Sequence, residues 1–189
     1  MNPVFRLAYL AVWGAAVACW WWLHREARDR SRLLSLLGDR HGGFVRTSFS
    51  WLTLTREAHE VEFVRMLGKV PCRFRLRYGL PLNRPGRPWT ALEFELPEPV
   101  MGDVPGGYSV ADLANGRGAF VAGVNATALI RKYVAELPAG TAPALSWHGA
   151  VLCVRFPFLM DYRQEVWVEH AIEFLSAMAK AVIAGGSDQ

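Results

Sequence analysis

The segment Glu60–Arg77, with the sequence EVEFVRMLGKVPCRFRLR, decides the fold of this chain. Gly68 and Lys69 predict the two-residue turn of a β-hairpin. Counting outward from this turn places apolar residues opposite apolar residues and, at the alternate positions, glutamates opposite arginines. The predicted pairs are Phe63 with Phe74, Val61 with Leu76, Glu62 with Arg75 and Glu60 with Arg77. A register shift of one residue would destroy both patterns, so the segment predicts an antiparallel sheet with one apolar face and one face of interleaved Arg and Glu.

Further strands are predicted on both sides of this hairpin. Thr90–Leu96 repeats the alternation of apolar and charged residues, and Phe44–Leu54 is rich in β-branched and aromatic residues. Leu145–Phe156 predicts a second hairpin, with its turn at His148 and Gly149. Two stretches rich in proline and glycine are predicted loops: Pro81–Pro88 and Pro97–Gly107.

Two helices are predicted in the second half of the chain. Asn125 is a suitable N-cap residue for a helix that runs through Leu137 and ends before Pro138. A last helix is predicted over Tyr162–Ala184, where apolar residues recur on one side of the helical wheel. This apolar stripe comprises Val168, Ile172, Leu175, Ala179 and Val182. An antiparallel sheet combined with two helices in the C-terminal half predicts an α+β fold class.

A membrane-spanning helix is predicted at the N-terminus. Leu7–Leu23 contains 17 residues without a charge, which as a helix cover about 25 Å, the short end of the length that crosses a bilayer. Three tryptophans stand where the aromatic belt of a membrane interface is found, and a basic segment follows them. The predicted membrane-interface residues are Trp20, Trp21, Trp22, Arg25, Arg28, Arg30 and Arg32.

The apolar period continues beyond the predicted span. Leucines at 33, 34, 36 and 37 extend it, so we expect the helix to run on to Gly38, a suitable residue to end it. Residues 1–37 are therefore assigned to an anchor helix with a basic extension, residues 38–43 to a connector and residues 44–189 to the α+β domain.

A cleaved signal sequence is the alternative to an uncleaved anchor. Ala16–Cys19 is weakly similar to the lipid-attachment motif of bacterial lipoproteins. Three tryptophans directly after that point would be unusual for either kind of signal, so we expect an uncleaved anchor. Arg6 precedes the span, whereas four arginines follow it closely. The positive-inside rule then predicts a single-pass protein of the plasma (inner) membrane with its C-terminal domain in the cytoplasm.

The charge distribution favours membrane lipids over nucleic acid as partners. The chain carries a net charge of +4, but from His41 onward 15 Lys and Arg stand against 14 Asp and Glu. The basic excess therefore lies beside the span, where it can attract anionic headgroups, whereas a nucleic-acid-binding protein carries a basic face on its folded domain. The cysteines at 19, 72 and 153 lack CxxC spacing, which favours reduced thiols and argues against a structural zinc.

None of the charged or glycine-rich patterns has the spacing of a catalytic, cofactor or metal site. The row Arg73, Arg75 and Arg77 is expected to be neutralised by cross-strand glutamates, with an anion or acidic partner as the alternative. The glycines of Asn115–Gly118 lack the Lys-Ser or Lys-Thr of a phosphate-binding loop. Glutamates at 165, 169 and 173, beside His170, predict a solvated helix face rather than a metal site.

One face of the predicted span carries small residues: Ala11, Gly14, Ala15 and Ala18. Tyr9, Trp13 and Trp20 fall on the opposite face. Small residues let a second helix approach closely in lipid, so the expected partners are other transmembrane subunits of a protein complex.

These patterns together favour a function without catalysis and without a cofactor. We expect an accessory or structural subunit of a larger integral membrane complex, for example a respiratory or photosynthetic assembly. The alternatives are a membrane-tethered ligand-binding or sensor module and a membrane-anchored enzyme.

Overall fold

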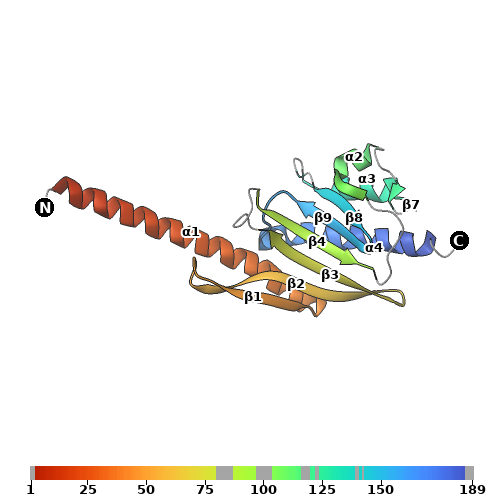
Figure 1. The fold of residues 1–189 in the computed structure, drawn as a ribbon, viewed down its shortest axis with the longest axis horizontal. Coiled ribbons are helices and arrows are strands. Elements are labelled where there is room, and N and C mark those ends of the chain that lie inside the picture. The colour runs from red at the N-terminus through yellow and green to blue at the C-terminus, as the bar shows by residue number, and fades with distance from the viewer. Residues whose placement is uncertain are drawn as a thin grey trace.

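The computed structural model describes residues 3–79, 87–96, 104–115, 120–121, 124–138, 141 and 143–185. Within these ranges the chain forms a seven-stranded sheet in the order β1-β2-β3-β4-β9-β8-β5, in which every pairing is antiparallel (Figure 1). Its strands are β1 (Phe44–Ser50), β2 (Thr55–Leu67), β3 (Val70–Gly79), β4 (Trp89–Glu95), β5 (Val104–Ser109), β8 (Ala144–His148) and β9 (Val151–Phe156). A separate short pair consists of β6 (Phe120–Val121) and β7 (Val124–Asn125).

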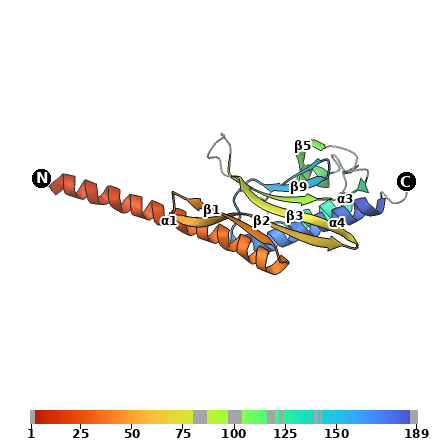
Figure 2. The ribbon, with the colours of Figure 1, turned by 60° about the horizontal axis from the view of Figure 1, so that its bottom comes forward.

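Helices lie before the first strand of the sheet, between β5 and β8, and after β9, which gives an α+β fold. The helical elements are α1 (Pro3–His41), α2 (Val110–Ala114), α3 (Thr127–Glu136), the short 3-10 helix η2 (Tyr162–Gln164) and α4 (Glu165–Gly185). Figure 2 shows α4 and the C-terminal part of α1 on the same side of the sheet. The N-terminal part of α1 extends away from the sheet as a single helix.

The central hairpin has the register predicted from its sequence. Phe63 lies opposite Phe74 and Glu62 lies opposite Arg75, and the pairs of Val61 with Leu76 and of Glu60 with Arg77 are also confirmed. The turn works because Gly68 has a φ of +67°, a conformation that glycine adopts without steric cost. The apolar side chains of these pairs therefore lie on one face of the sheet and are buried.

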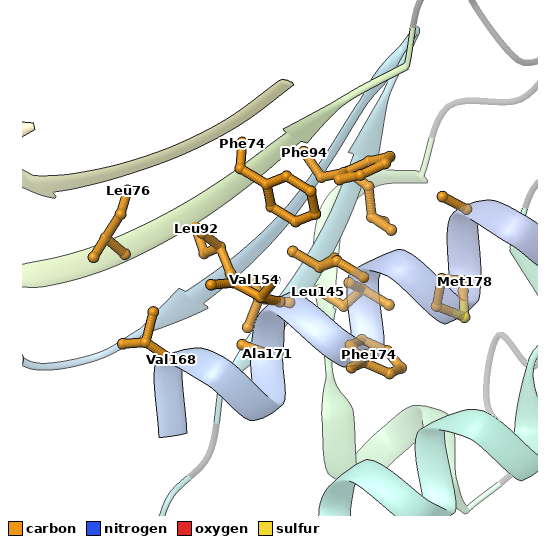
Figure 3. Close-up of a cluster of buried hydrophobic side chains, with 14 of the residues drawn as sticks. Phe74, Leu76, Leu92, Phe94, Leu145, Val154, Val168, Ala171, Phe174 and Met178 are labelled. Atoms are coloured by element: carbon orange, nitrogen blue, oxygen red, sulfur yellow. The ribbon is translucent and has the colours of Figure 1, made fainter. Parts of the chain in front are cut away.

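That apolar face forms the core against α4 and α1. Phe74 stacks on Phe63 with ring centroids 5.1 Å apart and meets the edge of Phe94 at 4.6 Å. Figure 3 shows Val168, Ala171, Phe174 and Met178 of α4 beneath the sheet residues. The predicted apolar stripe of the last helix is buried at all five of its positions: Val168, Ile172, Leu175, Ala179 and Val182.

Helix α1 ends three residues later than predicted, at His41 rather than Gly38. Gly38 is buried, and a Cβ atom at this position would lie 2.7 Å from Cγ2 of Val45, so its lack of a side chain serves close packing. The helix ends at Gly42, which has a φ of +64°, and the Gly43 amide donates to the Gly38 carbonyl at 2.7 Å. This is the usual glycine-terminated helix end, moved one turn along the chain.

Three other boundaries differ from the prediction. The strand predicted over Phe44–Leu54 ends at Ser50, and residues 51–54 form a turn. Asn125 is not an N-cap, because it pairs within β7 and α3 begins at Thr127. Strand β5 starts at Val104, inside the predicted loop Pro97–Gly107. Residues 97–103 of that loop, and residues 81–86 of the other, lie outside the described part of the chain.

Candidate membrane interface

The N-terminal part of α1 is long and apolar enough to cross a membrane, judged by length and composition. Its apolar window is entirely exposed, with large side chains such as Leu10, Val12 and Val17 open to the surroundings. Exposing a continuous apolar helix to water is costly, because each buried aliphatic side chain is worth about 1.5–3 kcal/mol. A lipid environment removes that cost.

The predicted helix-packing residues lie along this exposed part of α1 and touch no other element described. Ala11, Gly14, Ala15 and Ala18 are all exposed, and a Cβ atom placed on Gly14 would meet nothing within 4 Å. On the other side of the helix, Tyr9 and Trp13 contact each other edge to face, with ring centroids 6.2 Å apart. The small-residue face is therefore open along its whole length.

The predicted membrane-interface residues divide into two groups. Trp20, Trp21 and Trp22 are exposed, and so are Arg25, which lies 5.8 Å from the centroid of the Trp21 ring, and Arg28. The second group faces the domain. The Arg30 carbonyl accepts a hydrogen bond from the Tyr78 hydroxyl at 3.5 Å, and the Arg32 guanidinium lies 4.6 Å from the Tyr162 ring centroid. The side chains of α1 thus change from exposed to packed against the domain within about two turns.

The C-terminal part of α1 is part of the domain core. Leu33, Leu34 and Leu37 are fully buried against the sheet. Ala27 is buried one to two turns earlier in the helix. The basic extension assigned to the anchor therefore supplies core side chains.

Ion pairs fasten the end of α1 to α4. Arg40 contacts Glu165 at 2.6 Å and Glu169 at 3.0 Å, and Nε2 of His41 lies 3.0 Å from Oε1 of Glu169. The side chains of these two glutamates are about four-fifths covered, so the solvated helix face predicted for them is wrong at Glu165 and Glu169. The sequence could not reveal this contact, because 124 positions or more separate the partners.

Sequence reasoning missed the turn between β1 and β2. Trp51 is 83% exposed, Leu52 62% and Leu54 61%, whereas the polar Thr53 between them is 3% exposed. We name residues 49–54 the apolar tip, because Phe49 is also exposed and contacts Trp51 edge to face at 5.0 Å. The signal that could have found it is the run Trp-Leu-Thr-Leu, which lacks the Gly, Pro, Asn, Asp and Ser residues of an ordinary surface turn.

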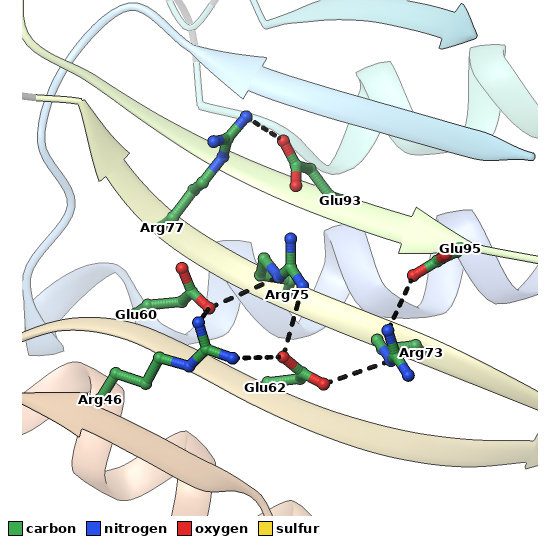
Figure 4. Close-up of polar contacts among 8 residues, drawn as sticks. All are labelled: Arg46, Glu60, Glu62, Arg73, Arg75, Arg77, Glu93 and Glu95. Carbon is green, nitrogen blue, oxygen red and sulfur yellow. Dashed lines mark hydrogen bonds and ion pairs between the residues drawn. The ribbon is translucent and has the colours of Figure 1, made fainter. Parts of the chain in front are cut away.

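The outer face of the sheet carries a ladder of alternating charge (Figure 4). Arginine on β1 is followed by glutamates on β2, arginines on β3 and glutamates on β4. Arg73 contacts Glu62 at 3.2 Å and Glu95 at 3.3 Å, and the remaining contacts are Arg46 with Glu60 and Glu62, Arg75 with Glu60 and Glu62, and Arg77 with Glu93.

This ladder has no net charge, since its ion pairs join four arginines and four glutamates. The predicted neutralisation of the arginine row is confirmed, and glutamates lie on both sides of it. A shallow depression on this face is lined by Arg73, Arg75, Glu93, Glu95 and Val151. Partly exposed ion pairs of this kind contribute below about 1 kcal/mol each, so the ladder sets strand register more than stability.

The other chemically reactive side chains lie apart from one another. Burial raises the pKa of the Cys72 thiol, and burial together with Glu93 raises that of Cys153 to about 11. His59 and His148 are exposed, and Nδ1 of His170 lies 4.0 Å from Oε2 of Glu136. The described residues contain no group of three metal-ligating side chains. The glycines at 116, 118 and 123 lie outside the described part of the chain.

Comparison with known proteins identifies no relative, so the function is inferred from the structure. No protein-family model matches the chain, and no curated protein and no solved structure is significantly similar to it.

Proposed function

We propose that this protein is a non-catalytic structural subunit of a larger integral membrane complex, in which α1 crosses the membrane and packs against another transmembrane helix. The observation that carries the proposal is the continuity of α1. One helix begins as an exposed apolar rod and ends as a core element of the domain, without a linker between the two parts.

This continuity fixes the height of the domain and its rotation relative to the span. The residues between Leu23 and Leu33 include neither proline nor glycine, the residues at which helices usually bend. The far end of the helix is held by buried leucines and by the ion pairs of Arg40. A protein that must find a diffusing substrate gains from a flexible tether, whereas a subunit that occupies one place in an assembly gains from a rigid one.

The membrane-tethered sensor is the second candidate, and the interior of the domain gives it little support. The space between sheet and helices, where a ligand would bind, is filled by buried side chains (Figure 3). Trp147, Phe156 and Tyr133 are among the largest of them and are buried almost completely. The depression on the outer face of the sheet is polar and lined by paired charges, which already satisfy one another.

We further propose that the membrane is the plasma (inner) membrane and that the domain lies on its cytoplasmic side. Arg25 and Arg28 follow the span and are exposed, which suits the excess of positive charge found on the cytoplasmic side. A reporter enzyme that is active only outside the cytoplasm, fused after Gln189, is expected to be inactive. A fluorescent protein that matures in the cytoplasm, fused at the same residue, should be bright. The reverse pattern would overturn this orientation.

Leucine substitutions on the small-residue face test the proposed contact with another span. Gly14→Leu and Ala18→Leu are each expected to reduce recovery of the partner several-fold, because a large side chain separates the two backbones and removes their close contacts. Insertion should be unchanged, since leucine is favourable at the centre of a bilayer. The measurement is mass spectrometry of proteins that co-purify in mild detergent from membranes with equal expression.

The matched control lies on the opposite face. Trp13→Leu changes a residue at the same depth in the span but away from the small side chains, and it should have little effect on recovery. Undiminished recovery of the partner with both Gly14→Leu and Ala18→Leu would indicate that α1 only anchors the domain in the membrane. An isolated monomer that carries a small molecule would instead favour the sensor.

A further inference from the structure

The apolar tip at residues 49–54 reverses the ordinary pattern of a surface turn. The polar residue points inward: the Thr53 hydroxyl donates to Glu57 and lies 3.1 Å from that of Thr55. The apolar residues Trp51, Leu52 and Leu54 point outward. Leu54 has a φ of +56°, a left-handed conformation that is strained for a residue with a branched side chain. A strained turn that exposes its largest apolar side chains indicates a surface built for contact with an apolar environment.

The tip lies level with the end of the predicted span. The Ala58 amide donates to Oγ of Ser31 at 3.0 Å, which fixes β2 against α1 at that height. Thr55 begins β2 three residues before Ala58, so it lies about 10 Å nearer the N-terminal end of the molecule. Helix α1 covers 10 Å in about six to seven residues. The tip is therefore level with His24 and Arg25, next to the end of the apolar run at Leu23. In both views the turn between β1 and β2 lies beside the middle part of α1 (Figure 1 and Figure 2).

The tip also lies on the aromatic side of α1. Ser31, which contacts β2, follows Trp20 by 11 residues and Trp13 by 18, which are about three and five full turns of helix. The two tryptophans therefore lie on the side of α1 along which β2 runs. The small-residue face, which is opposite to them, remains open to a second helix.

Cationic side chains lie at the height of the tip. Arg56 is exposed and lies opposite Phe49 in the β1–β2 pairing, and Arg25 and Arg28 are exposed on α1 at a similar height. Glu57 and Glu26 are less exposed, and Glu57 accepts the Thr53 hydrogen bond within the turn. Tryptophan and leucine flanked by arginine is the composition of segments that enter the headgroup region of a bilayer.

We propose that the apolar tip is a second membrane contact, which inserts Trp51, Leu52 and Leu54 into the headgroup region of the bilayer that α1 spans. The inference rests on the part of the proposed function that makes α1 a membrane span, and it is independent of any partner subunit. With α1 and the tip both in the membrane, the domain has two points of attachment, which limit the tilt of α1 relative to the bilayer. The open small-residue face is then presented at a fixed tilt.

A fluorescent label at the tip tests this contact in the full chain. Leu52→Cys, in a Cys19→Ala background, is labelled with an environment-sensitive maleimide dye and reconstituted into vesicles of phosphatidylcholine and phosphatidylglycerol. The native thiols compete poorly, because Cys72 is fully buried and the pKa of Cys153 is raised to about 11. In unlabelled lipid we expect the dye emission to be blue-shifted. When the lipids carry a nitroxide near the headgroup, we expect most of the emission intensity to be lost.

Met66→Cys in the same background is the matched control. Met66 is also apolar and 58% exposed on β2, but it lies eight residues beyond Ala58, about 26 Å farther from the span. Its label should emit as in water and should not be quenched by the nitroxide lipid. A label on Cys19 of the unaltered chain, placed in detergent before reconstitution, is the positive control for the span.

The outcomes separate the two proposals. Quenching at 19 without quenching at 52 overturns the inference and leaves the span in place. If the label at position 19 is not quenched, both the membrane span and the proposed function are contradicted. A label at 52 that is shielded from iodide but not reached by the lipid nitroxide indicates contact with protein, a second copy included, and also overturns the lipid contact.

Discussion

Phe74→Ala should lower the free energy of unfolding by about 3–5 kcal/mol. Phe74 is fully buried in the centre of the sheet, between Phe63 and Phe94, and above α4. Truncation removes its contacts with both rings and leaves a cavity that rigid neighbours cannot fill. The measurement is chemical denaturation of the full chain in mild detergent, followed by near-ultraviolet circular dichroism.

Arg75→Ala, at the adjacent position of β3, is the control for the opposite face of the sheet. Arg75 contacts Glu60 and Glu62 at 3.5 Å, but Glu60 also contacts Arg46, and Glu62 contacts Arg46 and Arg73. The glutamates therefore keep cationic partners, and the expected loss is below about 1 kcal/mol. Equal losses for the two variants would contradict the assignment of the two faces.

Removing α1 should abolish cooperative folding of the domain. A fragment of residues 44–189, the domain as the sequence divides it, lacks the fully buried Leu33, Leu34 and Leu37. Each such leucine is worth about 2–5 kcal/mol against alanine, and together they match the 5–15 kcal/mol of a whole domain. A fragment of residues 24–189 keeps all three and should unfold in one transition. Thermal unfolding by far-ultraviolet circular dichroism distinguishes the two fragments.

A point substitution makes the same test without truncation. Leu34→Ala in the full chain should cost about 2–5 kcal/mol, whereas Ser35→Ala, at the next and exposed position of α1, should be nearly neutral. If residues 44–189 melted cooperatively at the temperature of the longer fragment, α1 would be an attachment to the domain rather than part of its core.

A rigid α1 and the proposed membrane-inserted tip have a common consequence for assembly. A single helix leaves the domain free to tilt relative to the bilayer, so a partner must capture it at the correct tilt. Two attachment points limit that freedom before the partner binds, and pre-organisation of this kind lowers the entropic cost of association. The small-residue face of α1 and the apolar tip are therefore parts of one proposed arrangement.

The sequence by itself determined the features that depend on neighbouring residues along the chain. The register of the central hairpin follows from the two-residue turn and from alternation with a period of two, and both signals lie within Glu60–Arg77. The apolar stripe of α4 follows from helical periodicity in the same way. The apolar run of α1 follows from composition alone.

The tertiary structure alone decided the features that join distant segments. Gly38 looked like the end of a helix, but it lies where Val45 of β1 packs closely on α1, and Gly42 ends the helix instead. Glu165 and Glu169 looked solvated until the fold brought Arg40 and His41 beside them. The apolar tip looked like the end of a strand, because Trp51 and Thr53 have high β propensity. Only the packing of β2 along α1 places that tip at the height where the apolar run of α1 ends, since neither segment encodes its position relative to the other.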